Sequence, residues 1–410
     1  MIRFIILSIA LTLFGFGSFA QTFDDYFKLA AENNPGLKAQ YNEYEAALQK
    51  VDQVKALPDP TFSFGYFISP AETKVGPQKA KLSLSQMFPW FGTLKAQGDA
   101  AALMAEAKYQ NFIDARNKLR LELAAAYFPL YELNEWIRIE QENINVLKSY
   151  KTIANQKFNE GAGSMVDVLR VDIMLKDSET NLEILKTKET PLIASFNKLL
   201  NRPENEAVST GDSLKTILLP TDFRKDSLTA LNPKIKALSL KLQASLASER
   251  AAKKQGLPKL GVGLDYVIVD KGSNLSLPDN GKDIVMPMIS ISIPIFRSKY
   301  NALVKEAQLT RKGYENKLLD ETNTLVSEYE MAMFQLNQQE QLISLYQKQI
   351  ETTKQSINLL LTSYANSGKE FEEVLRMQQQ LLKYQKMHIS ALVQYQIAVE
   401  KINYLTSNIY

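Results

Sequence analysis

The chain contains 410 residues, among them 48 basic and 45 acidic side chains, one histidine and no cysteine. Its formal net charge of +3, with both signs mixed along the chain, shows no concentrated basic region of the kind that binds nucleic acid. The lack of cysteine in this sequence excludes a disulfide scaffold, a thiolate metal site and a lipid-modified N-terminal cysteine.

The first twenty residues have the pattern of a secretory signal peptide. Arg3 is followed by an apolar run up to Phe16, and the segment ends with Phe19-Ala20. We therefore expect residues 1–20 to be removed by cleavage after Ala20. A membrane-anchoring helix is the alternative, disfavoured because the apolar run is shorter than the roughly 18 residues that a span needs.

Four later segments alternate apolar residues with small, polar or charged ones, and they are expected as strands over 60–69, 79–90, 258–270 and 284–296. Period two over about ten residues is what a membrane-spanning β-strand requires. The alternative is a half-buried sheet in a soluble domain. The membrane is favoured because the second face is small or charged, as in a water-filled lumen, and because the chain offers nothing to cover the apolar face. We expect these apolar residues to face lipid: Leu84, Val262, Leu264, Ile289 and Ile291.

Four strands cannot close a membrane barrel, since the smallest need about eight, and open edges are not tolerated in hydrocarbon. Several chains must therefore share one barrel. Pro287 lies inside the fourth segment and has no amide proton, so that strand is expected to begin late or to be bulged there.

Two very long helices are expected, over 93–160 and 298–366. The first contains only Gly98 and Pro129 as helix-disfavouring residues and is otherwise rich in strong helix formers. At 1.5 Å per residue it would be about 100 Å long. Pro129, and Pro191 in the return helix that follows, predict local kinks or breaks.

The chain also contains two copies of one unit. Matching motifs recur in the same order at offsets of 198 to 206 residues, beginning with Asn34-Pro35 and Asn232-Pro233. Each copy starts with a helix, over about 23–56 or 224–255. A strand hairpin, a long helix, a tight turn and a return helix complete each copy. We therefore expect a signal peptide (1–20), a first repeat (21–200), a connector (201–223) and a second repeat (224–410).

With these motifs in place, the chain resembles the TolC-like outer-membrane efflux proteins. The resemblance covers nearly the whole chain after residue 20. It is carried by the order of weak motifs: the duplication, Asn34-Pro35, Phe88-Pro89-Trp90-Phe91-Gly92, the alanine-rich helix start Lys95–Ala101, the turn Phe158…Gly161…Ser164…Asp167-Val168-Leu169 and its echo Tyr364…Gly368…Glu373-Val374-Leu375.

This resemblance implies a mixed α and β fold in which three copies form one twelve-stranded barrel continued by a helical tunnel in the periplasm. It implies a passive outer-membrane channel of a tripartite efflux or secretion system. It also implies a periplasmic adaptor and an inner-membrane pump as partners, with outer-membrane lipid around the barrel.

The two helix reversals are expected together at the periplasmic tip, where partners dock, at Gly161, Gly163 and Gly368. In the resembled family, acidic residues of the second turn motif line the tunnel entrance. Glu373 occupies the first of these positions, whereas Arg376 replaces the second and could instead latch the helices. The alternative is that the acidic residues only offset a helix dipole and face solvent. The candidates for the constriction are Glu373, Arg376, Asp167 and Glu370.

No pattern predicts an enzyme, a cofactor or a metal site. The single histidine, His388, has no accompanying nucleophile motif, and no nucleotide-binding loop occurs. Met286 and Met288 share a strand face and could contact a soft metal, although packing is the commoner use of methionine. A periplasmic coiled-coil adaptor without a barrel is the alternative function; it is disfavoured because adaptors of that kind carry one helical hairpin rather than two.

Overall fold

The computed structural model describes residues 22–211, 214, 225–273, 278–367 and 371–407. The expected signal peptide, Gly368 and Glu370 lie outside these ranges. The described elements follow one another along the chain as α2 (Phe23–Asn33), α3 (Pro35–Lys55), β1 (Thr61–Thr73), β2 (Gly76–Phe88), α4 (Thr93–Asn159), α5 (Met165–Leu200), α6 (Lys225–Leu231), α7 (Pro233–Gln255), β3 (Lys259–Val269), β4 (Ile284–Ser292), α8 (Arg297–Ser367) and α9 (Phe371–Thr406).

Helices α4 and α8 are the long helices that the composition predicts, with 67 and 71 residues. The expected break at Pro129 is wrong, because α4 continues through it. A proline inside a helix has a cost of about 3 kcal/mol, from the lost hydrogen bond and from the clash of its ring with a carbonyl group. It is offset by burial of the flanking Tyr127, Phe128 and Leu130, each at most 5% exposed. Helix α5 likewise continues through Pro191, between the buried Leu185 and Phe196.

The single helices expected over 23–56 and 224–255 are each two helices in the structure. Asn34 is extended, with φ −62° and ψ 120°, and its side-chain Oδ1 accepts a 3.0 Å hydrogen bond from the backbone of Leu37. Pro35 then supplies the first residue of α3, where its missing amide proton costs nothing. Pro233 begins α7 in the same way after Asn232. An Asn-Pro pair therefore ends one helix and starts the next.

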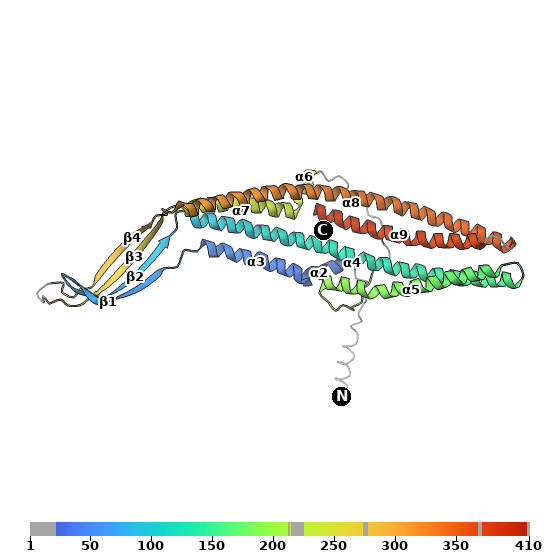
Figure 1. Ribbon diagram of the computed structural model, residues 1–410, viewed down its shortest axis with the longest axis horizontal. Helices are drawn as coiled ribbons and strands as arrows, with labels where there is room; N and C mark the ends of the chain where they lie inside the picture. Colours follow the sequence, from blue (N-terminus) through green and yellow to red (C-terminus); the bar gives the residue numbers. More distant parts are fainter. Residues whose placement is uncertain (1–21, 212–213, 215–224, 274–277, 368–370, 408–410) are drawn as a thin grey trace, which may run out of the picture. The chain divides into compact units, whose positions relative to one another are not determined.

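The strands form one antiparallel sheet in the order β1-β2-β3-β4 (Figure 1). The first hairpin is longer than expected, because the strands continue to a turn at Gly76, which has a φ of +125°. A register shift between Tyr66 and Ala71 accommodates Pro70. In contrast, β4 stays in register at Pro287, opposite Leu264, so the expected bulge there is wrong. Since β4 is an edge strand, proline there need not interrupt the β3–β4 pairing.

The described chain forms two compact units. One comprises residues up to Lys38 together with 114–232 and 324–410, and the other comprises 39–113 and 233–323. Both units contain segments from each expected repeat, so the compact units and the repeats divide the chain differently. Among the described helices, none combines the length and the apolar character needed to cross a membrane.

The first unit is held together partly by an ion-pair cluster around Arg120 of α4. Its Nε donates to Glu400 of α9 over 2.8 Å, and its Nη1 donates to Asp24 of α2 over 2.7 Å. The guanidinium also lies over the ring of Phe23, 4.9 Å from its centroid. Arg120 therefore joins three helices from distant parts of the sequence.

Candidate functional site

One face of the sheet is apolar and uncovered. The register places Leu84 opposite Leu264, and Val262 opposite Ile289. Ile291 lies opposite Leu260 on the same face. The five residues expected to face lipid are thus brought together on one surface, and each is about half exposed or more. An apolar surface of this extent, without any covering element in the chain as described, is typical of an interaction with lipid or protein.

The opposite face of the sheet is small and polar. Lys81 forms an ion pair across the strands with Asp265, whose side chain is fully buried within the chain. Gly261 and Gly263 lie on the same face, flanked by Ser83, Ser85 and Ser290 in the neighbouring strands. Met286 and Met288 also face this side; no described group of acidic or histidine side chains that could hold a metal accompanies them.

The first helix reversal is built by a glycine cap. Gly161 has a φ of +70°, its amide donates to the Phe158 carbonyl, and the Ala162 amide donates to the Lys157 carbonyl. This is the Schellman arrangement, which satisfies carbonyl groups left free at the end of α4. A side chain at Gly163 would clash with Lys157, because an added Cβ would lie 2.9 Å from its Cβ. Ser164 then caps α5 by accepting a hydrogen bond from the Val166 amide.

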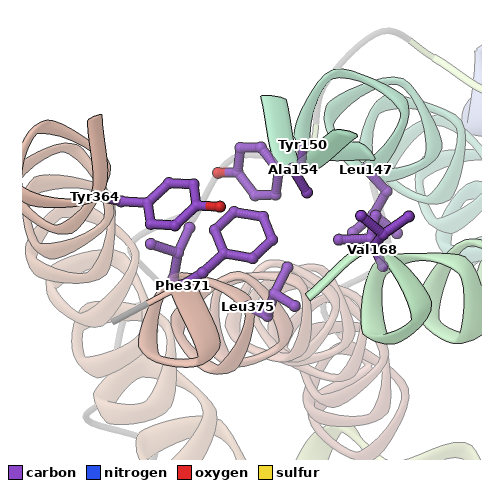
Figure 2. Packing of buried hydrophobic residues seen from close by; sticks show 9 residues of the cluster. Leu147, Tyr150, Ala154, Val168, Tyr364, Phe371 and Leu375 are labelled. Atoms are coloured by element: carbon purple, nitrogen blue, oxygen red, sulfur yellow. The ribbon is translucent and has the colours of Figure 1, made fainter. Parts of the chain in front are cut away.

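A hydrophobic cluster joins the ends of four helices beside this turn (Figure 2). Tyr364 of α8 stacks on Phe371 of α9 with ring centroids 4.4 Å apart, and Tyr150 of α4 meets Phe371 edge-on. Val168 contributes from α5. Burial, with a smaller contribution from the carboxylate of Asp167, raises the pKa of Tyr364. The cluster therefore packs the end of α8 and the start of α9 against α4 and α5 within one compact unit.

Charged side chains surround this cluster. Arg170 of α5 forms a 2.8 Å ion pair with Glu372 of α9 and lies 3.9 Å from Asp167 on its own helix. Glu373 pairs with Arg376 within α9, where the Arg376 Nε donates over 3.0 Å. An ion pair therefore joins α5 and α9. It is made by Arg170, whereas the described partner of Arg376 belongs to the same helix.

The two long helices are also linked at their ends. Lys157 Nζ of α4 donates a 2.9 Å hydrogen bond to the carbonyl oxygen of Ala365, in the last turn of α8. A lysine amine there satisfies a terminal carbonyl and lies at the negative end of the helix dipole. No sequence pattern identifies Lys157 or Ala365 as partners.

A buried polar network lies further along the same helices. Asn143 of α4 donates to Ser178 of α5 over 2.8 Å and accepts from Gln378 of α9 over 2.9 Å. All three side chains are about 95% buried. Close by in sequence, the buried Glu140 forms an ion pair with Lys386 of α9. The sequence signal for this network is the presence of polar residues at helix positions where apolar residues otherwise recur.

The fold and the two faces of its sheet define a class of protein. A four-stranded sheet with two unpaired edges and one uncovered apolar face, joined to helices of about 70 residues, is the subunit of a membrane-spanning assembly. The sequence matches the family model for outer membrane efflux proteins over residues 27–190 and 226–407. The chain therefore belongs to the outer membrane efflux protein family. It is an outer-membrane channel protein of an efflux system, with its helices in the periplasm.

Solved structures share this fold. The chain is similar to CusC, in a study of channel folding, with a TM-score of 0.80, 14% identity and coverage of 95% of this chain and 92% of that one. It resembles the CmeC outer membrane channel of Campylobacter jejuni, with a TM-score of 0.76, 17% identity and coverage of 94% and 85%. It is also similar to the open state of the MtrE channel of Neisseria gonorrhoeae, with a TM-score of 0.76, 17% identity and coverage of 94% of this chain and 89% of that one. No curated protein matches the chain.

Proposed function

We propose that three copies of the chain form one outer-membrane barrel and one periplasmic tunnel, through which substrates leave the periplasm passively. The observation that carries this proposal is the sheet, which exposes an apolar face and ends at β1 and β4. An even number of antiparallel strands lets β4 of one copy pair with β1 of the next in the same alternation. Joining copies in this way removes every edge.

The partners follow from membership of the family. A periplasmic adaptor and an inner-membrane pump feed substrate into the tunnel, while the channel itself supplies the passage through the outer membrane. The alternative function, a periplasmic adaptor without a barrel, has no support from the comparisons. Because the family is one of efflux channels rather than of enzymes, we expect no catalytic activity from this chain.

The helix tip is proposed as the gate. Its support is the set of contacts that join α4, α5, α8 and α9 there: the cluster around Phe371, the Arg170–Glu372 ion pair and the Lys157–Ala365 hydrogen bond. Glu373, Arg376 and Asp167 lie beside these contacts and are proposed to line the constriction. Gly161 and Gly163 form the turn that a partner would meet.

The test is the state of the protein purified from outer membranes in mild detergent. Light scattering should give a trimer, and the trimer should conduct ions across a planar bilayer. A conducting trimer that collapses to monomers on heating would agree with the proposal. A detergent-solubilised monomer with intact β-structure would contradict it, as would recovery of the mature protein in the soluble periplasmic fraction.

A further inference from the structure

A cationic cavity lies where the sheet meets the helices, within the compact unit that contains residues 39–113 and 233–323. Its volume is about 210 Å³. Three lysines line it, Lys254 at the end of α7, Lys259 at the start of β3 and Lys299 in the first turn of α8. Of the described residues that line this cavity, none is acidic. The cavity therefore concentrates positive charge that the surrounding side chains do not neutralise.

A buried hydroxyl at this cavity is left without a partner. Thr93, the first residue of α4, lines the cavity and is 3% exposed. Its Oγ1 makes no hydrogen bond with any described residue. A buried hydroxyl without a partner costs about 1–3 kcal/mol, so such a group in a native protein needs an explanation. A ligand oxygen that accepts a hydrogen bond from the Thr93 hydroxyl would provide that explanation.

Two helix N-termini add to the positive potential. Helix α4 begins at Thr93 and α8 begins at Arg297, so the positive ends of both helix dipoles lie near the cavity, while the Thr93 amide itself donates a 3.0 Å hydrogen bond to the Trp90 carbonyl. The surrounding backbone is held in place. Lys254 Nζ donates a 3.0 Å hydrogen bond to the Phe91 carbonyl, and Arg297 donates over 2.9 Å to the Gly256 carbonyl. Lys259 and Lys299 are exposed, whereas Lys254 is partly buried and held by the backbone.

We propose that this cavity binds a phosphate group, held by Lys254, Lys259, Lys299 and the hydroxyl of Thr93. A tetrahedral oxyanion has enough acceptor oxygens for several ammonium groups and one hydroxyl at once, and charge-assisted hydrogen bonds to it are strong. The phosphate belongs either to a phospholipid headgroup or to a free phosphate or phosphate ester in the periplasm. Trp90 and Tyr300, which also line the cavity, are of the residue types enriched where a protein meets lipid headgroups.

Trp90 provides a local fluorescent probe. The chain has two tryptophans, so a Trp136→Phe background leaves Trp90 as the only one. For a soluble phosphate ligand, the purified trimer in detergent should show a saturable change in Trp90 emission when inorganic phosphate is added at constant ionic strength, with chloride as the reference anion; for a lipid headgroup, phosphatidylglycerol in nanodiscs takes the place of inorganic phosphate. Lys259→Gln and Lys299→Gln should each weaken this binding about ten-fold, and Thr93→Val should weaken it about five-fold. Lys305→Gln, an exposed lysine of α8 outside the cavity, is the matched control and should change nothing.

Nanodiscs distinguish the two sources of phosphate. A change in Trp90 emission with phosphatidylglycerol, but neither with phosphatidylcholine nor with free phosphate, would assign the site to an anionic lipid headgroup. A response to free phosphate in detergent would assign it to a soluble ligand. The proposal is overturned if neither probe changes the emission, or if Lys305→Gln weakens binding as much as the cavity variants. Trimer formation and conductance of the variants are measured in parallel, so that loss of the channel is recognised separately.

Discussion

Arg170 and Glu372 join the two return helices of the chain through an ion pair of 2.8 Å. The residues belong to α5 and α9, and Figure 1 shows the start of both helices at the same end of this unit, beside the ends of α4 and α8. Their side chains are 42% and 67% exposed, so the pair stabilises this arrangement only modestly, by about 0.2–1 kcal/mol.

This pair gives a first prediction about the closed state. Arg170→Ala or Glu372→Gln should raise the mean conductance of the trimer in planar bilayers, because each of three copies loses about 0.2–1 kcal/mol that favours the packed tip. The two variants should behave alike, and the double variant should add little. Lys176→Ala is the control, since the described ion pair of Lys176 is made with Glu179 within α5. Unchanged conductance in both single variants would show that the pair does not hold the tip closed.

A second prediction concerns ion selectivity at the proposed constriction. Glu373→Gln should lower the preference for cations and weaken block by divalent cations, whereas Arg376→Gln should raise both. The opposite signs follow because Arg376 neutralises the Glu373 carboxylate within the same helix turn. A unit charge 4 Å away contributes about 1 kcal/mol in a water-like medium, or about a five-fold change in local ion occupancy.

The measurement is the reversal potential under a salt gradient. Glu183→Gln removes a carboxylate on α5 that forms its ion pair within that helix, and it serves as the control. If Glu373→Gln and Arg376→Gln leave the reversal potential where the control does, neither residue lines the constriction.

The elements and the sheet faces could be predicted from the sequence, because their signals are local. Alternation over ten residues identifies the face that carries Leu84 and Val262, and a long run of helix formers identifies α4. The effect of each proline depends on its neighbours and is harder to predict from the sequence. Pro129 interrupts α4 less than its missing hydrogen bond suggests because buried aromatic neighbours hold the helix. Pro35 separates two helices because Asn34 is extended and caps the second one.

The contacts of the candidate site could not be predicted in the same way. Arg170 and Glu372 are about 200 residues apart, and Lys157 bonds to a backbone carbonyl that has no sequence signature. Arg376 is an arginine that could latch the helices by sequence, but it pairs within its own turn, while Arg170, its counterpart in the other repeat, reaches across. Which of the two equivalent arginines joins α5 to α9 depends on the carboxylates around it. Arg170 of α5 reaches Glu372 of α9, whereas Arg376 pairs with Glu373 of its own helix.

A third prediction compares the two faces of the sheet. Leu84→Arg, Val262→Arg and Ile291→Arg should each reduce the yield of assembled trimer, because a charge facing lipid costs about 2–4 kcal/mol at the middle of the bilayer. Ser83→Arg and Ser290→Arg lie on the opposite face and should assemble while changing the conductance. The yield is read as heat-modifiable trimer on a gel. Equal losses from both faces would contradict the assignment of lipid and lumen sides.

The last prediction uses the single histidine as a probe of pH-dependent stability. His388 lies in α9, and partial burial lowers its pKa below the ordinary value of 6.5. Above that value the imidazole is neutral in both the folded and the unfolded protein, so burial has no pH-dependent cost. As the pH falls from about 6.5 toward the lower folded pKa, the unfolded chain takes up a proton that the folded chain does not. Folding stability should therefore decrease across this interval and level off below the folded pKa.

The thermal midpoint of the helical circular-dichroism signal, measured between pH 7.5 and 5.5, should fall for the parent protein. His388→Gln should flatten this dependence, because no other histidine in the chain titrates in this interval. Measurements stop at pH 5.5 so that the carboxylates stay ionised. A His388→Gln protein that loses as much stability as the parent on acidification would show that the buried imidazole is not the group responsible.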